Sequence, residues 1–208
     1  MSNTGNLGIS SVIILISFIL ISVTALSVLS NDTTNTTSEE EIEQMIDESI
    51  EEITKYIQIT DKIGKYYGPS HQKEIQKIAI MIKPFFSNEI DISELTIKIS
   101  NFKSVKILSY SGHAQPIDTN HLFTHPVWNN IDENTFGFIA THDTDNSLSD
   151  YNILNKNTDM AYIIITLSPD FYMKKGDIIT VQLFLTSGII KTVNLEAPLP
   201  MRSIISFD

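Results

Sequence analysis

The hydrophobic positions divide the chain into an apolar run, an amphipathic acidic stretch and a second half in which apolar and polar residues alternate. The apolar run covers residues 5–30 and contains no ionisable side chain. As a helix, residues 7–29 would extend about 35 Å, and a bilayer span requires roughly 20 residues. A helix that is apolar on every side must be buried on every side. We predict a core helix over residues 7–30, with these large side chains in need of burial: Ile9, Val12, Ile13, Ile14, Ile16, Phe18, Ile19, Leu20, Val23, Leu26 and Leu29.

Three interpretations of this run differ in what buries it. A cleaved secretory signal normally has a basic start and a shorter apolar stretch, and residues 1–30 show neither feature. A membrane anchor agrees with the length, but basic residues orient an anchor, and the first Lys or Arg of the chain is Lys55. Ser and Thr lie on all faces of the run and permit close helix–helix approach. The sequence therefore leaves open a membrane tether and a bundle of identical helices.

A polar linker follows the apolar run. Residues 31–37 are rich in Asn and Thr. Asn31 and Asn35 each begin the acceptor pattern for N-glycosylation. We predict a linker over residues 31–37 with N-linked glycans at these two positions, the alternative being an unmodified polar connection between two helices.

The next segment is acidic and amphipathic. Ser38 and Glu41 form a capping box, and isoleucines then recur every three or four residues with acidic residues between them. Gly64 and the Gly-Pro pair that follows it are typical of a helix end. We predict an acidic amphipathic helix over residues 38–63, which completes an N-terminal helical region of residues 1–68.

The second half of the chain has the alternation of half-buried strands. In residues 94–100, apolar and polar positions alternate cleanly, and Gly-containing turn signals separate most of the later segments. Such short strands argue for an antiparallel sandwich or barrel, so we predict an α+β fold with a β-sandwich outer domain over residues 69–208. Residues 111–134 are expected to form an exposed, partly structured loop. The predicted strands are 75–86, 94–100, 105–110, 135–142, 160–168, 177–187 and 189–197.

Composition excludes several classes of function. The formal charge is −11, whereas phosphate binding needs clustered Lys and Arg, so no nucleic-acid partner is expected. The chain has no cysteine and therefore neither a disulfide framework nor a cysteine-ligated metal. Its histidines show no metal-ligand spacing, and no nucleophile motif is present. We expect no enzymatic activity and no required cofactor.

One segment has the composition of a cation site. Asp143, Asp145, Asn146 and Asp150 supply hard oxygen donors whose early spacing partly resembles that of an EF-hand loop. The central glycine and the terminal glutamate of an EF-hand are absent. The segment is either a polar turn or a Ca²⁺ or Mg²⁺ site that stiffens an extracellular loop.

Four segments, in order along the chain, resemble archaellins, the archaeal flagellins that build the swimming filament. Residues 8–29 resemble the glycine-led N-terminal helix of that family, and residues 75–100 resemble its first strands. Residues 143–154 and 174–200 resemble its closing segments. The resemblance implies an Ig-like sandwich on a long hydrophobic helix, within the type IV pilin-like superfamily, and polymerisation through the helices. It also implies N-glycosylation and bound metal in the outer domain.

The resemblance further implies partners. A prepilin-type peptidase would process the precursor, and a membrane motor with its own ATPase would drive the filament. The leading hypothesis is a structural subunit of an extracellular cell-surface filament, the archaellum, for motility and surface adhesion. The subunit would be in the membrane only before assembly and then polymerise with itself or with sister subunits through the apolar side chains of residues 7–30. The alternatives are a membrane-anchored accessory protein that does not polymerise, and an adhesive type IV-like pilin.

Overall fold

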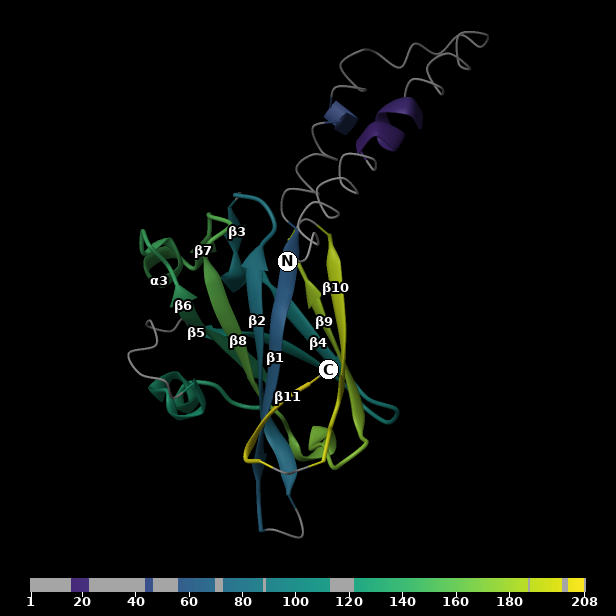
Figure 1. Ribbon diagram of the computed structural model, residues 1–208, viewed down its shortest axis with the longest axis vertical. Helices are drawn as coiled ribbons and strands as arrows, with labels where there is room; N and C mark the ends of the chain where they lie inside the picture. The colour runs from purple at the N-terminus through teal and green to yellow at the C-terminus, as the bar shows by residue number, and fades with distance from the viewer. Residues whose placement is uncertain are drawn as a thin grey trace, which may run out of the picture. The chain divides into compact units, whose positions relative to one another are not determined.

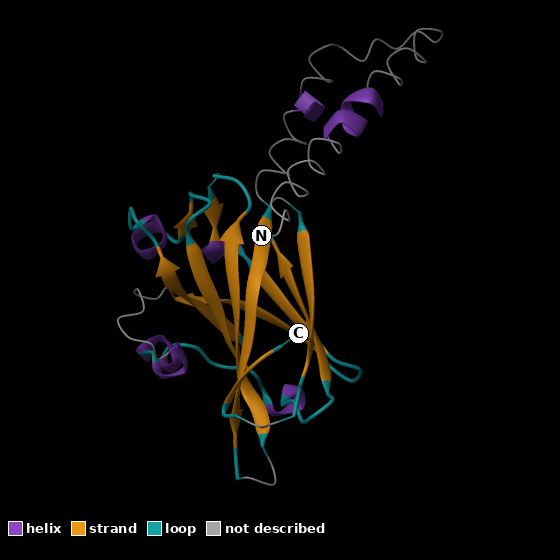
Figure 2. Ribbon diagram, in the orientation of Figure 1, coloured by secondary structure: helices purple, strands orange, loops and turns teal. Residues whose placement is uncertain are grey.

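The structure is a computed structural model of the 208-residue chain. It describes residues 16–22, 44–46, 56–69, 73–87, 89–112, 122–186, 188–199 and 202–207. The chain divides into two compact units, Met1–Ile50 and Glu51–Asp208. The second unit is mostly β-structure with a few short helices (Figures 1 and 2).

In the first unit, residues 16–22 and 44–46 are helical, which places the first of these stretches inside the predicted core helix and the second inside the predicted acidic helix. Four apolar side chains of the first stretch are exposed in the single chain: Ile16, Phe18, Leu20 and Ile21. Within the described residues, no helix combines the length and the apolar character that a membrane span would need. The predicted linker and these predicted core residues lie outside the described residues: Ile9, Val12, Ile13, Ile14, Val23, Leu26 and Leu29.

The second unit contains eleven strands among its described residues. They are β1 (Ile57–Tyr67), β2 (Glu74–Pro84), β3 (Ile90–Asp91), β4 (Thr96–Ser100), β5 (Val105–Gly112), β6 (Thr135–His142), β7 (Ile153–Leu154), β8 (Met160–Thr166), β9 (Ile178–Phe184), β10 (Ile190–Glu196) and β11 (Ile204–Ser206). Its short helices are η2 (Ile92–Glu94), η3 (Leu122–Thr124), η4 (Pro126–Asn129), α3 (Ser147–Tyr151) and η5 (Pro169–Phe171). All seven predicted strands are present, and their observed bounds differ from the expected ones by at most three residues.

Nine of the strands form one continuous sheet, and β5 connects its two halves. The strand order is β10-β9-β4-β5-β6-β8-β2-β1-β11, and β3 pairs with β7 separately. The first half of β5 pairs with β4, where Ile107 lies opposite Lys98, and its second half pairs with β6, where Tyr110 lies opposite Phe136. The sheet thereby folds into two layers, which Figure 1 shows one behind the other.

The β5–β6 pair is parallel, so the prediction of a purely antiparallel domain is wrong at this position. All other paired strands among the described residues are antiparallel. Parallel neighbours need a long crossover between them. The connection between Gly112 and Thr135 supplies that crossover, because Thr135, the first residue of β6, lies opposite Ser109 in the middle of β5.

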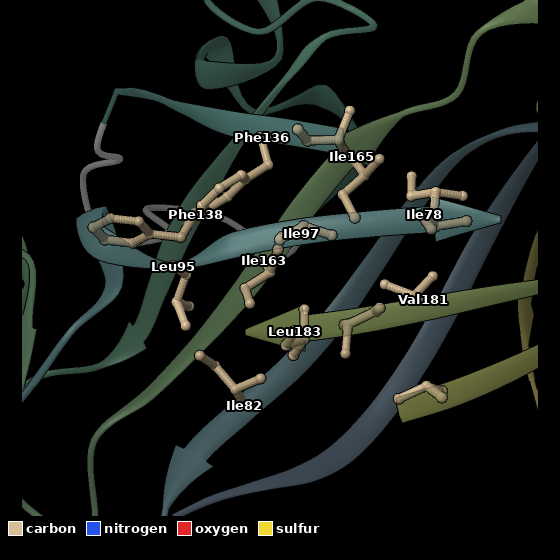
Figure 3. Close-up of a cluster of buried hydrophobic side chains, with 14 of the residues drawn as sticks. Ile78, Ile82, Leu95, Ile97, Phe136, Phe138, Ile163, Ile165, Val181 and Leu183 are labelled. Carbon is tan, nitrogen blue, oxygen red and sulfur yellow. The ribbon is translucent and has the colours of Figure 1, made fainter. Parts of the chain in front are cut away.

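The main core lies between the two layers. Ile163 and Ile165 of β8 and Val181 and Leu183 of β9 point into the same space, together with isoleucines of β2 and β4 (Figure 3). These positions follow the period of two that a strand with one buried face requires. The alternation predicted for residues 94–100 is therefore the alternation that fills the core.

The predicted acidic helix is wrong over its last seven residues. Ile57–Tyr67 form β1, which pairs along its length with β2. The β-branched residues at the start of β1 fit the helical stripe and the strand equally well, and pairing with β2 decides between them. Gly64 is a residue of the strand interior and not a helix end, and a Cβ at this position would lie 2.8 Å from Phe207. The β domain thus begins before residue 69.

The predicted exposed loop is also wrong in part. Phe123, Val127, Trp128 and Ile131 are buried and pack against Ala79 of β2, Ile139 of β6 and Ile164 of β8, forming a second apolar cluster on the outer face of the sheet. The Trp128 indole donates a hydrogen bond to the carbonyl of Leu122 at 2.8 Å. Strands β2, β6 and β8 therefore have buried apolar residues on both faces of the sheet. The inner face packs in the main core, and residues 122–131 cover the outer face.

Candidate metal centre

Antiparallel pairing of β6 and β8 creates the candidate site. His142, the last residue of β6, lies opposite Met160, the first residue of β8. The residues that follow β6 and precede β8 therefore meet at one end of this strand pair. Asp143, Asp145 and Asp159 come together there, and each contributes a carboxylate oxygen that lies within 4.8 Å of the other two.

Asp143 is fixed by the helix that follows it. Its Oδ2 atom accepts hydrogen bonds from the backbone N–H and the hydroxyl of Ser149, both at 2.9 Å. Ser149 lies in the first turn of α3, where backbone N–H groups have no partner within the helix. Helix α3 therefore holds one oxygen of Asp143, and the Oδ1 atom is buried without a hydrogen-bond donor among the described residues.

Asp159 is completely buried. Its Oδ2 atom accepts hydrogen bonds from the backbone N–H groups of Asn155 and Lys156, at 3.1 Å and 2.9 Å. Its Oδ1 atom has no hydrogen-bond donor among the described residues. A buried carboxylate oxygen without a partner is costly, so this arrangement calls for a further electropositive group.

Asp145 and Asn155 complete the group. Asp145 Oδ2 accepts hydrogen bonds from Asn155 Nδ2 at 3.1 Å and from the Lys156 ammonium at 2.8 Å. These hydrogen bonds, that of Lys156 first, hold the pKa of the Asp145 carboxyl well below its ordinary value. The same contact raises the pKa of Lys156. The amide oxygen of Asn155 is a third buried acceptor without a donor among the described residues.

This donor set fits a hard divalent cation. Three carboxylates face one ammonium group, which leaves the cluster with two net negative charges. Carboxylate and amide oxygens are the ligands that Ca²⁺ and Mg²⁺ prefer. Among the described residues, the buried side-chain acceptors without a hydrogen-bond donor are Asp143 Oδ1, Asn155 Oδ1 and Asp159 Oδ1. A cation bound between the carboxylates of Asp143 and Asp159 would supply the positive charge that this group lacks.

The sequence identified part of this group. Asp143 and Asp145 belong to the cluster, whereas the carboxylate of Asp150 is exposed and is not part of it. Asn146 adopts a left-handed conformation (φ 60°) before α3. Asp159 and Asn155 were missed because they are distant in sequence. The register of β6 with β8 is the signal that could have found Asp159, and it is not visible in a single local motif.

The sequence also contains two predicted glycosylation positions and several histidines for which no role is predicted. Asn31 and Asn35 lie outside the described residues. His125 serves a structural purpose, since its Nδ1 atom accepts a hydrogen bond from the N–H of Val127 at the start of η4. His142 pairs with Met160 in the sheet.

The protein family of this chain follows from its similarity to known sequences. A family model described as archaeal-type flagellin matches residues 5–194. The chain belongs to the archaeal-type flagellin family. Flagellin B3 of Methanocaldococcus jannaschii is 31% identical over 152 residues, which cover 71% of this chain and 68% of that relative. This family consists of structural flagellins and not of enzymes, as predicted.

Solved structures show the same fold. The crystal structure of archaeal flagellin FlaB1 from Methanocaldococcus jannaschii matches with a TM-score of 0.65 at 19% identity, covering 73% of this chain and 95% of that chain. The archaeal flagellum of Methanospirillum hungatei strain JF1 matches with a TM-score of 0.51 at 13% identity, covering 97% and 99% of the two chains. The family match over residues 5–194 and the identity to Flagellin B3 confirm the resemblance to archaellins, and these structures share the fold.

Proposed function

We propose that this archaeal-type flagellin is a structural subunit of an extracellular archaeal filament that serves motility. Its membership of the flagellin family over residues 5–194 carries the proposal. The likeness to the Methanospirillum hungatei flagellum over nearly the whole of both chains supports it. A filament subunit needs no substrate pocket. It also needs no nucleotide site of its own, because a membrane motor with its own ATPase would drive the filament.

The N-terminal apolar segment is the proposed assembly element. Phe18 is 66% exposed and Ile21 is 63% exposed in the single chain. Exposure of several large apolar side chains on one helical stretch is unfavourable by roughly 1.5–3 kcal/mol for each side chain. Packing of residues 7–30 among the same residues of neighbouring copies would remove this surface from water. The long helix and the Ig-like character of the outer domain belong to this proposal.

The metal centre has a structural role in the same proposal. A Ca²⁺ or Mg²⁺ ion would be held by Asp143, Asn155 and Asp159, with Asp145 at the edge beside Lys156. When bound, the ion neutralises the carboxylates and ties the end of β6 to the start of β8. Because α3 and β7 lie between these residues in sequence, the whole 143–159 segment would gain rigidity on the filament surface.

The proposed filament function also implies how the subunit is processed and where it resides before assembly. We infer that a prepilin-type peptidase and a membrane motor complex act on the subunit during assembly. The subunit resides in the membrane only before it joins the filament. N-linked glycans at Asn31 and Asn35 would lie in the polar segment that follows the apolar one.

Substitution within the apolar segment tests the assembly mechanism. Ile16→Asp places a charge in the proposed dry helix bundle, where an unpaired charge is costly, and we expect no filaments on the cell surface by electron microscopy. Ile204→Asp is the matched control, since Ile204 is an exposed strand residue of the outer domain, and it should leave filaments unchanged. Normal filaments from the Ile16→Asp variant would contradict assembly through this segment.

A further inference from the structure

One large apolar side chain of the outer domain is far more exposed than the others that the structure describes. Phe102 is 94% exposed, the highest value among the described large apolar residues. It lies in the turn between β4 and β5, and the turn is well held. The side-chain oxygen of Asn101 accepts hydrogen bonds from the N–H groups of Lys103 and Ser104, and its amide donates to the carbonyl of Asp170. The turn thus presents the Phe102 ring to solvent on a fixed support.

A recess of suitable volume for this ring lies next to the N-terminal end of β4, opposite the end that carries Phe102. Its volume is about 190 Å³, and its lining includes the apolar side chains of Ile90, Leu95, Ile153 and Leu185. Apolar cavities of about 150 Å³ are large enough to bind benzene. The volume of the recess is therefore sufficient for one phenyl ring.

The ring and the recess cannot meet within one molecule. Leu95 immediately precedes β4 and Phe102 follows it by two residues, so the two are separated by roughly 23 Å at about 3.3 Å per residue. A contact between them must join two copies and use different surfaces on each. Contacts of this head-to-tail type produce open helical polymers when the rotation does not close.

Charge complementarity favours the same pairing. Lys103 follows Phe102, is exposed, and forms no ion pair with the described residues. The recess is rimmed by the carboxylates of Glu89, Asp91 and Glu94. In a chain with a net charge of −11, copies repel one another unless cations of one meet carboxylates of the next.

We propose that Phe102 of one subunit inserts into the Ile90–Leu95–Ile153–Leu185 recess of the next, with Lys103 beside the carboxylates of its rim. This inference rests on the proposed filament function and adds a contact between outer domains to the contact between apolar helices. The occupant of the recess is a second copy of this chain.

Introduced thiols test the contact in the full chain. The chain has no cysteine, so Lys103→Cys and Thr186→Cys in one subunit supply one thiol on each side of the contact; Thr186 also lines the recess. Sheared filaments are treated with a short thiol–thiol crosslinker and separated by denaturing electrophoresis. We expect a ladder of dimers, trimers and longer chains, because every subunit carries both halves of the contact.

The controls separate this contact from chance proximity. Lys103→Cys alone and Thr186→Cys alone should remain monomeric. Arg202→Cys with Thr186→Cys moves the first thiol to another exposed basic position and should give no ladder. Adding Phe102→Ala to the crosslinking pair should reduce the ladder about tenfold or more, because the buried ring is lost.

Two results would overturn the contact and leave the filament function standing. One is intact filaments of the Lys103→Cys/Thr186→Cys variant that yield only monomers. The other is a ladder of equal strength from the Arg202→Cys pair. Failure to find the wild-type chain in any filament would instead contradict the proposed function.

A charge exchange provides an independent measurement. Lys103→Glu and Glu94→Lys should each lower the temperature at which filaments dissociate, and the two together should restore it. Lys175→Glu makes the same charge change at another exposed position and should have little effect. Additive losses in the double variant would overturn the pairing.

Discussion

A carboxylate oxygen of Asp143 lies within 4.8 Å of a carboxylate oxygen of Asp159, and each residue has a buried Oδ1 atom without a hydrogen-bond donor among the described residues. Two such carboxylates repel each other unless a cation or a proton separates them. The fold holds them in place through backbone and side-chain donors to their Oδ2 atoms. Their arrangement therefore supports a bound divalent cation as part of the stable outer domain.

Removal of the cation is the first prediction. Ca²⁺ or Mg²⁺ at about 100 times its dissociation constant stabilises the folded state by about 2.7 kcal/mol. Chelation should therefore lower the melting temperature, and Asp159→Asn should reduce the response to added cation. Asp150→Asn is the control, because Asp150 is exposed and lies outside the cluster. A melting temperature that chelation leaves unchanged in wild type would rule out the site.

Two glycines in strands give a matched pair for the second prediction. A Cβ at Gly64 would lie 2.8 Å from a ring carbon of Phe207 and 3.1 Å from Ile75, whereas a Cβ at Gly112 would have no neighbour within 4 Å. Overpacking in a tight core typically costs about 1–3 kcal/mol. Urea denaturation should show a loss of this size for Gly64→Ala and a much smaller change for Gly112→Ala. Equal effects of the two substitutions would contradict the placement of residue 64 inside β1.

The third prediction concerns alkaline pH. The Tyr162 hydroxyl donates a hydrogen bond to Asp61 Oδ2 at 2.8 Å, and burial, with the contact to Asp61, raises the pKa of Tyr162 above its ordinary value of about 10. The unfolded chain therefore loses this proton at lower pH than the folded chain does. The stability that the raised pKa provides is fully present below about pH 10 and decreases as the pH rises through the folded pKa.

Tyr162→Phe removes this proton from both states. The free energy of unfolding, measured by denaturant titration from pH 8 to the highest pH at which the wild type folds, should fall less steeply in the variant. A residual slope is expected, because burial also raises the pKa of Tyr110. Identical slopes for variant and wild type would show that Tyr162 does not contribute to the pH dependence.

The sequence predicted those elements whose pattern is decided locally. Residues 94–100 alternate because β4 buries one face, and residues 160–168 are a continuous apolar run because β8 is covered on both faces. The failures are non-local. The pattern predicts a helix at the start of β1, because the isoleucines near Ile57 satisfy both periodicities, and only pairing with β2 selects the strand.

The same distinction explains the candidate site. Asp143 and Asp145 were identified because they are near each other in sequence. Asp159 was not identified, because it lies 16 residues after Asp143 and reaches the cluster through the register of β6 with β8. Asp150 fits the linear spacing of the segment, but it lies within α3 and its carboxylate is not part of the cluster. The burial of Trp128 likewise depends on an apolar outer sheet face that no local pattern reveals.

Immunogold electron microscopy of cell-surface filaments tests the central claim most directly. Cells that express this chain are sheared, and the released filaments are labelled with an antibody against the β domain. The filament proposal predicts labelling along the whole length of the filaments and loss of these filaments when the gene is deleted. Confinement of the chain to the membrane fraction, with unlabelled filaments that persist in the deletion strain, would contradict it.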